Sequence, residues 1–251
     1  MNRPLESRSA FLLTLAVVCL ALGSVSMAHA ASVTLVISGE ASVTDSTLYE
    51  DFPNGNNGGG GMIHVGNNGV GSARRAVLRF DVSAIPMGST VTEATLRLTV
   101  EASGGTATNF DVFALEESWV EGSNVGFGSG LGEGASPEAG AVSWNSREHG
   151  TALWTAAGGT FPVAPSATAP AEDTGNQVWT DNTIGFGLVE DVQTWVDGAP
   201  NHGWIIIGDS TNVRTARRFT GTEGGAPIWP TLTVTYSPSS ISSVGGWEIY
   251  R

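Results

Sequence analysis

The sequence predicts an all-β fold, a single jelly-roll-type β-sandwich with one short helix and long glycine-rich loops. Short segments that alternate apolar and polar residues recur along the chain, which is the pattern of half-buried strands. The chain has 34 glycines and only 14% charged residues, and turn-forming residues separate the strand-like segments. Many short strands at such spacing are typical of antiparallel sandwiches rather than of parallel α/β sheets.

The clearest strand signals are residues 75–80 and 95–100, which a loop containing Pro86 and Gly88 connects. Each segment places apolar side chains on one face and arginine or threonine on the other. If these two strands pair, three arginines share the outer face of one sheet: Arg75, Arg79 and Arg97.

The other expected elements follow from the same periodicities. Further strands are expected at residues 32–38, 46–50, 62–66, 108–115, 203–208, 216–221 and 230–236. Residues 187–198 predict one short helix, because Leu188, Val192 and Val196 recur at helical spacing. Two glycine-rich stretches without an apolar period, residues 52–62 and 122–141, indicate long surface loops.

The N-terminal residues 1–30 have the pattern of a secretory signal peptide. Two arginines precede an apolar run that ends near an A-x-A cleavage site, and the run is shorter than the ~20 apolar residues of a membrane span. We therefore expect a secreted protein, extracellular or at the cell surface, whose mature chain has no membrane span. The sandwich domain is expected at residues 31–236, and a flexible C-terminal tail at 237–251.

Composition narrows the possible partners of the mature chain. The single cysteine, Cys19, lies within the expected leader, so stability has to come from a hydrophobic core, for which about 220 residues suffice. Removal of the leader changes the formal net charge from -13 to -14, and such an acidic balance argues against nucleic-acid binding. Every cationic side chain is an arginine, whose planar fork suits carboxylate, sulfate or phosphate groups.

A series of sequence blocks resembles the disaggregatase-related domain, also called the DNRLRE domain, which overlaps carbohydrate-binding module family 96. The blocks occur in family order and cover almost the whole mature chain: DSTLYEDFPNGNNGG, IHVG, RRAVLRFDVSAIPMGSTVTEATLRL, ESWVEG, AVSWNSR, VEDVQTWVDGAPNHGWII, ARRFTGTE and PTLTVTY. One block departs from the family pattern. The family usually has Phe-x-Ser-Arg-Glu there, whereas Phe219 is followed by Thr-Gly-Thr-Glu, with Arg217 and Arg218 just before it.

The resemblance implies a secreted bacterial or archaeal sandwich of jelly-roll type, found alone or beside carbohydrate-active enzymes and cell-surface proteins. Some relatives bind acidic polysaccharides such as alginate. Guanidinium groups on an outer sheet face bind uronate carboxylates or sulfate esters well. The candidate binding arginines are Arg75, Arg79, Arg97, Arg217 and Arg218. The alternative is that they pair with the protein's own acids, such as Asp81, Glu93, Glu101 or Glu223, or that their stems cover apolar surface.

Aromatic side chains provide a second kind of candidate, because sugar C–H faces stack on exposed rings. Trp195 and Trp204 lie among apolar residues and are expected in the core. Tyr49, Trp154 and Trp179 lie next to less regular sequence and are the candidates for carbohydrate binding. Burial in the core is again the alternative for all three.

The residues around position 50 supply the oxygen ligands that calcium prefers. The candidate calcium ligands are Asp45, Glu50, Asp51 and Asn54, although their spacing is not that of an EF-hand. The alternative is an ordinary loop of Asx turns. The histidines are isolated in sequence, which disfavours zinc.

Catalytic motifs are weak in this sequence. It has no G-x-S-x-G nucleophile elbow, and its adjacent acidic pairs would point to opposite faces of a strand. The leading hypothesis is therefore a secreted, non-catalytic module that binds polysaccharide, including acidic polysaccharide. One alternative is a structural or adhesive protein of the cell surface or extracellular matrix without a small ligand, and another is a polysaccharide-degrading enzyme.

Overall fold

The structure is a computed structural model that describes residues 31–126 and 134–239. The expected signal peptide and residues 240–251 of the expected tail lie outside the described residues. The strands are β1 (Val33–Ser38), β2 (Val43–Tyr49), β3 (Met62–Asn67), β4 (Ala73–Phe80), β5 (Thr90–Ser103), β6 (Asn109–Ala114), β7 (Ser146–Glu148), β8 (Ala152–Leu153), β9 (Ala167–Pro170), β10 (Gly175–Asp181), β11 (Trp204–Ile207), β12 (Arg217–Thr220) and β13 (Thr231–Ser237). The helices are α1 (Gly187–Val196) and the short 3₁₀ helix η1 (Thr222–Gly224).

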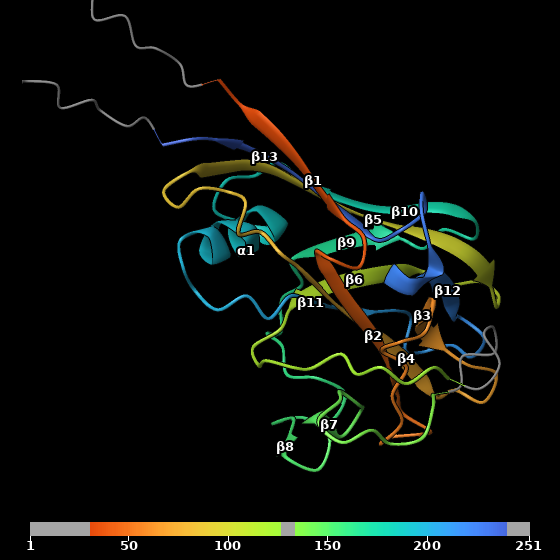
Figure 1. Cartoon of the computed structure of the whole chain (residues 1–251). Coiled ribbons are helices and arrows are strands. Elements are labelled where there is room, and N and C mark those ends of the chain that lie inside the picture. Colours follow the sequence, from red (N-terminus) through yellow and green to blue (C-terminus); the bar gives the residue numbers. More distant parts are fainter. Residues whose placement is uncertain (1–30, 127–133, 240–251) are drawn as a thin grey trace, which may run out of the picture.

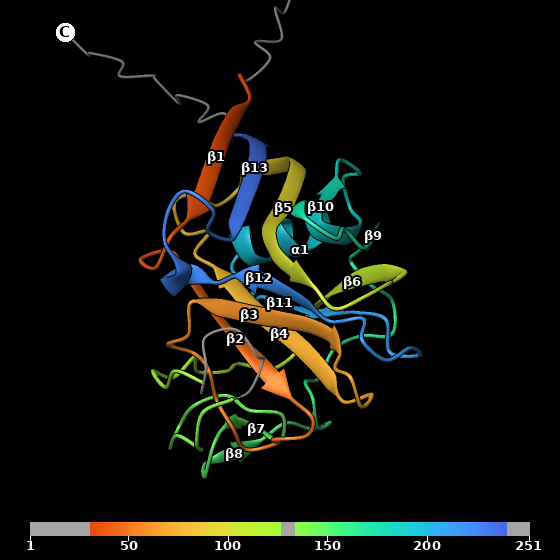
Figure 2. The same cartoon turned by 90° about the vertical axis from the view of Figure 1, so that its right-hand side faces the viewer.

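The strands form a large antiparallel sheet that curls around a core, so the predicted all-β sandwich is confirmed (Figures 1 and 2). Along the sheet the order is β1-β13-β5-β12-β3-β4-β11-β6-β9, while β10 adds to β5 and β2 adds to β4. Strand β3 pairs with β12 on one side and β4 on the other, which joins the two halves. The hairpin of β7 and β8 is a separate sheet, below β2, β3 and β4 in Figure 2.

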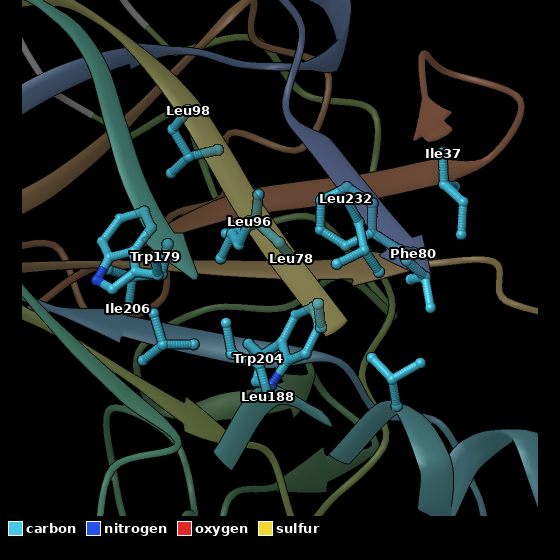
Figure 3. Close-up of a cluster of buried hydrophobic side chains, with 14 of the residues drawn as sticks. Ile37, Leu78, Phe80, Leu96, Leu98, Trp179, Leu188, Trp204, Ile206 and Leu232 are labelled. Atoms are coloured by element: carbon cyan, nitrogen blue, oxygen red, sulfur yellow. The ribbon is translucent and has the colours of Figure 1, made fainter. Parts of the chain in front are cut away.

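The main core lies between the two halves of this sheet. Leu78 and Phe80 of β4 and Leu96 of β5 are fully buried there, together with two tryptophans (Figure 3). Trp179 donates a hydrogen bond from Nε1 to the Phe110 carbonyl oxygen at 2.9 Å, and Trp204 donates one to Asp191 Oδ2 at 2.6 Å. Both indole N–H groups are thus satisfied inside an apolar core, where an unpaired donor is unfavourable.

The predicted helix forms as α1 and packs against β5 and β10. Its apolar stripe, Leu188, Val189, Val192 and Val196, is buried and completes the main core. The Val189 N–H donates to Asp181 Oδ2 at 3.2 Å, which satisfies one of the free N–H groups of the first turn. No helix in the described ranges is long and apolar enough to cross a bilayer.

A second core covers the other face of β4. Val77 of β4, Leu48 of β2 and Ile205 of β11 pack there against side chains from the segment between β6 and β9. This segment, residues 115–166, is called the covering segment below, and it carries β7 and β8. Its buried members in the second core are Leu115, Trp119, Val142, Trp144 and Trp154. The central strand is therefore buried on both faces.

Two sequence expectations about arrangement were wrong. Strand β4 pairs with β2, β3 and β11, and β5 pairs with β10, β12 and β13, so the two arginine-bearing strands do not pair with each other. The loop between them carries the chain from one half of the sheet to the other. The stretch 52–62, expected as a surface loop, is largely buried, because Asn56 Nδ2 donates to the carbonyl oxygens of Glu121 at 2.7 Å and Val142 at 2.9 Å.

Replacement of Trp179 by Phe should destabilise the fold without changing glycan binding. The variant loses the hydrogen bond to Phe110 and leaves a void, which should lower the free energy of unfolding by about 1–3 kcal/mol. Urea unfolding and glycan affinity electrophoresis measure the two effects. Val178→Ala on the same strand, 39% exposed, is the matched control. If Trp179→Phe kept its free energy of unfolding but lost glycan binding, the result would support the stacking role that the sequence predicted for Trp179.

Candidate functional site

Two of the predicted binding arginines lie on β4 beneath the covering segment. Arg75 donates from Nη1 to the Gly158 carbonyl oxygen at 2.7 Å, and its guanidinium carbon lies 4.7 Å from the Trp144 ring centroid and 5.6 Å from that of Phe161. Burial lowers the pKa of Arg75. Cation–π contacts and a carbonyl compensate the desolvated charge, so Arg75 joins the covering segment to the sheet.

Arg79, four residues further along β4 and on the same face as Arg75, has the same kind of environment. Its guanidinium carbon lies 5.4 Å from the Trp119 ring centroid, and Nη1 donates to the Trp119 carbonyl oxygen at 3.4 Å. Both arginines are half-buried and engaged by the protein itself. Their partners are carbonyl groups and aromatic rings. They are not the acidic side chains that the sequence analysis gave as possible partners.

The remaining predicted arginines lie on the other half of the sheet. Arg97 on β5 donates to Asn176 Oδ1 at 3.2 Å and to Thr231 Oγ1 at 2.9 Å. Arg217 is buried, and its guanidinium donates to Asp173 at 2.6 Å and to three carbonyl oxygens. Arg218 is half-buried on β12, in register with His64 of β3. The expected single arginine face does not form, because β4 and β5 belong to opposite halves of the sheet.

The predicted aromatic platforms are buried. Tyr49 and Trp179 are 1% exposed and Trp154 is 5% exposed, so none of them offers an open ring face to a sugar. Tyr49 lies under the guanidinium of Arg74, and Trp154 donates from Nε1 to the Ser143 carbonyl oxygen at 2.9 Å. These placements correct the prediction of stacking, and the reason is that both cores of the domain recruit aromatic side chains for buried area.

The expected calcium ligands do not converge. Asp51 forms an ion pair with Arg74 at 2.8 Å, Glu50 accepts the Ala73 N–H at 2.8 Å, and Asn54 accepts from Asn145 at 3.1 Å. Asp45 is fully buried and accepts the Thr222 N–H at 2.7 Å. Across the described part of the chain, no group of three or more His, Cys, Asp or Glu side chains is arranged to hold a metal ion.

Asp45 instead belongs to a small group of interacting carboxyls. Its backbone N–H donates to Glu121 Oε1, and its Oδ1 is buried without a hydrogen-bond partner among the described residues. Burial, with the nearby charges of Glu223 and Glu121, raises the pKa of Asp45 well above its usual value. Burial also raises the pKa of Glu121, to about 7. A protonated Asp45 removes most of the electrostatic conflict in this group.

An open cleft of about 390 Å³ lies between the β5–β6 loop and the β11–β12 loop. Arg214 lines it, together with Gly104, Gly105, Thr106, Asp209 and Asn212. The Arg214 side chain is exposed and has no hydrogen-bond or ion-pair partner in the described residues, unlike the other arginines found there. We call this the Arg214 cleft. Sequence reasoning missed it, because no apolar period marks either loop.

The backbone of the Arg214 cleft is held firmly. Arg214 has φ of 60°, a left-handed conformation that is unfavourable for a residue with a side chain, and its N–H donates to the Asn68 carbonyl oxygen at 2.9 Å. Asp209 accepts hydrogen bonds from Thr211 and Asn212, including the Thr211 hydroxyl at 2.7 Å. These bonds lower the pKa of Asp209. The carboxylate thus orders the loop, and the guanidinium is left available to a ligand.

A second open cleft, of about 450 Å³, lies beside the β7–β8 hairpin. It is lined by Asn54 from the β2–β3 loop and by residues of the covering segment, among them Asn145, His149, Leu153 and Trp154. Trp154 is the one predicted carbohydrate-binding residue that borders either cleft. We call this the Trp154 cleft.

Comparison with known proteins gives one family match. The model described as carbohydrate-binding module family 96 matches residues 37–124, from the end of β1 through β6 and into the covering segment. Over these residues the match confirms the resemblance to carbohydrate-binding module family 96, and it supports carbohydrate binding. The match includes the β5–β6 loop of the Arg214 cleft and Asn54 of the Trp154 cleft, whereas Arg214 and the other lining residues of both clefts come after position 124. A search of curated proteins found no match.

Because Asp45, Glu121 and Glu223 form a cluster of interacting carboxyls, we expect the free energy of unfolding to fall as the pH rises from about 4.5 to 7. Glu121 keeps its proton up to about pH 7 in the folded protein but releases it near 4.5 when unfolded, so the folded state binds more protons in this window. The free energy of unfolding, measured by urea titration, should fall by about 1–2 kcal/mol, an estimate reduced for the partial exposure of Glu121.

Glu121→Gln should flatten this pH dependence, since glutamine resembles the protonated acid and does not titrate. Glu116→Gln, at an exposed position nearby in sequence, is the control and should keep the dependence of the native protein. Equal pH dependence in native protein and Glu121→Gln would contradict the assignment.

Proposed function

We propose that this protein is a secreted, non-catalytic carbohydrate-binding module that binds an anionic group of an acidic polysaccharide at Arg214. The match to carbohydrate-binding module family 96 supports the general activity. The single observation that supports the site is the unpartnered Arg214 guanidinium on the wall of an open cleft. Secretion rests on the leader pattern of residues 1–30.

The chemistry of the Arg214 cleft suits a carboxylate or a sulfate ester. A guanidinium donates two parallel hydrogen bonds to such a group, and the backbone around it is already ordered, so little backbone entropy is lost on binding. Gly104 and Gly105 add no side chains to the cleft lining, and Thr106 adds a hydroxyl. The nearby Asp209 does not cancel this positive charge by an ion pair, because its oxygens accept bonds from its own loop.

The non-catalytic assignment is supported by the residues that line the two clefts. Hydrolysis of a glycosidic bond ordinarily needs two carboxyl groups that face each other across the substrate, ~5–9.5 Å apart. Asp209 is the only Asp or Glu that lines the Arg214 cleft, and the Trp154 cleft is lined by neither type. Neither cleft therefore offers an acid and a base on opposite sides of a bound sugar.

Replacement of Arg214 by Gly should weaken binding to acidic polysaccharide by about tenfold or more. Glycine tolerates the left-handed backbone of this position, so the variant removes the guanidinium without adding strain. Loss of a bidentate charge-assisted interaction accounts for the expected size. Affinity electrophoresis and calorimetry with alginate, polygalacturonate and dextran sulfate measure it, at about 0.15 M salt so that the net negative charge of the protein is screened.

Arg97→Ala is the matched control, because it removes a half-buried arginine of β5 that is not among the residues lining the cleft. It should leave the affinity unchanged. Arg214→Lys keeps the charge but lacks the fork, so it should give an intermediate affinity. Failure of the native protein to bind any of the three polyanions would sink the proposal and favour a structural or adhesive role. Binding that survives Arg214→Gly would place the site elsewhere.

A further inference from the structure

The Trp154 cleft differs from the Arg214 cleft in the character of its lining. Among the residues that line it there is no Asp, Glu or Arg, although the whole chain carries a formal charge of -13. The polar groups at this cleft are amides, a hydroxyl and an imidazole from Asn54, Asn145, Ser146 and His149. A lining of this kind favours an uncharged ligand rich in hydroxyl groups over a charged one.

One wall of the Trp154 cleft is apolar. Leu153 is 70% exposed although it is a large aliphatic side chain, and it lines the cleft together with Trp154. Trp154 is fixed by its hydrogen bond to Ser143 and by its packing in the second core, so this wall is rigid. Leucine and an indole edge provide a surface on which the C–H face of a sugar ring can pack with loss of water.

The two asparagines form the polar side of the same cleft. Asn145 Nδ2 donates to Asn54 Oδ1 at 3.1 Å, which ties the β2–β3 loop to the covering segment and fixes both amides. Each amide has two N–H donors and a carbonyl with two lone pairs, so one shared hydrogen bond leaves several donors and acceptors. The backbone of Asn145 is also fixed, since its N–H donates to the Pro53 carbonyl oxygen at 2.9 Å and its carbonyl accepts from Trp154 at 3.2 Å.

We infer that the Trp154 cleft is a second glycan site, which binds a neutral hexopyranose unit between Leu153 and the paired amides of Asn54 and Asn145. The apolar wall packs against the C–H face of the ring, and the amides exchange hydrogen bonds with its hydroxyl groups. The cleft volume of about 450 Å³ lies within the ~300–1,000 Å³ of small-molecule sites. This inference does not depend on Arg214, because the two clefts share no lining residue.

Neutral glycans test the inference directly. The native protein is run in affinity gels containing hydroxyethyl cellulose, laminarin, galactomannan or pullulan, and bound glycans are then titrated calorimetrically as oligosaccharides. At least one neutral glycan should retard the native protein. Leu153→Ala and Asn145→Ala should each weaken that binding by about tenfold, while Arg214→Gly leaves it unchanged.

Val163→Ala is the matched control, because Val163 is a fully exposed aliphatic residue of the same covering segment. Leu153 is itself mostly exposed, so its replacement should not affect folding, and thermal unfolding of each variant verifies this. Absence of retardation by all four neutral glycans would overturn the inference. So would binding that persists in both Leu153→Ala and Asn145→Ala, or that is lost in Arg214→Gly. If the protein bound neutral glycans but not acidic ones, the proposed function of the Arg214 cleft would be contradicted and the inference about the Trp154 cleft would stand.

Discussion

The burial of both faces of β4 is the constraint on which the rest of this structure depends. One face of the strand contributes Leu78 and Phe80 to the main core, and the other contributes Val77 to the second core. A strand with two covered faces cannot leave an arginine fully solvated, so the guanidinium groups of Arg75 and Arg79 lie among carbonyls and indole rings. Their stems and charges hold the covering segment in place, which in turn forms the walls of the Trp154 cleft.

Periodicity predicted most of the regular elements because the side-chain pattern of a strand or helix is local. The helix near position 190 and the strands at 75–80 and 95–100 appear where alternation or helical spacing placed them. The short strands β7 to β10 were not predicted, since segments such as Ala167–Pro170 and Gly175–Asp181 contain proline, glycine or asparagine and pair at sheet edges or in a hairpin. Hydrogen bonds from neighbours, rather than intrinsic preference, make them strands.

The alternation of apolar and polar residues predicts that a strand has two different faces. It does not predict which parts of the chain pack against each face. The arginines of β4 and β5 do point away from the main core, as the sequence indicates, but the pairing of strands decides whether they meet. A short connection normally suggests a hairpin, whereas here it crosses between the halves of a curled sheet. For the same reason the sequence could not show that Tyr49 and Trp179 are enclosed, since their covering residues come from distant parts of the chain.

The two clefts were the least predictable part of the molecule, because irregular segments form them and distant contacts set their shape. The left-handed backbone of Arg214 is accompanied by a hydrogen bond from its N–H to Asn68, far away in the sequence, and this contact has no local signature. The sheet arginines Arg75, Arg79 and Arg217 are engaged internally, whereas Arg214 on its loop is exposed. The two clefts therefore differ in electrostatic character: charged side chains, Arg214 and Asp209, line one, and uncharged amides line the other.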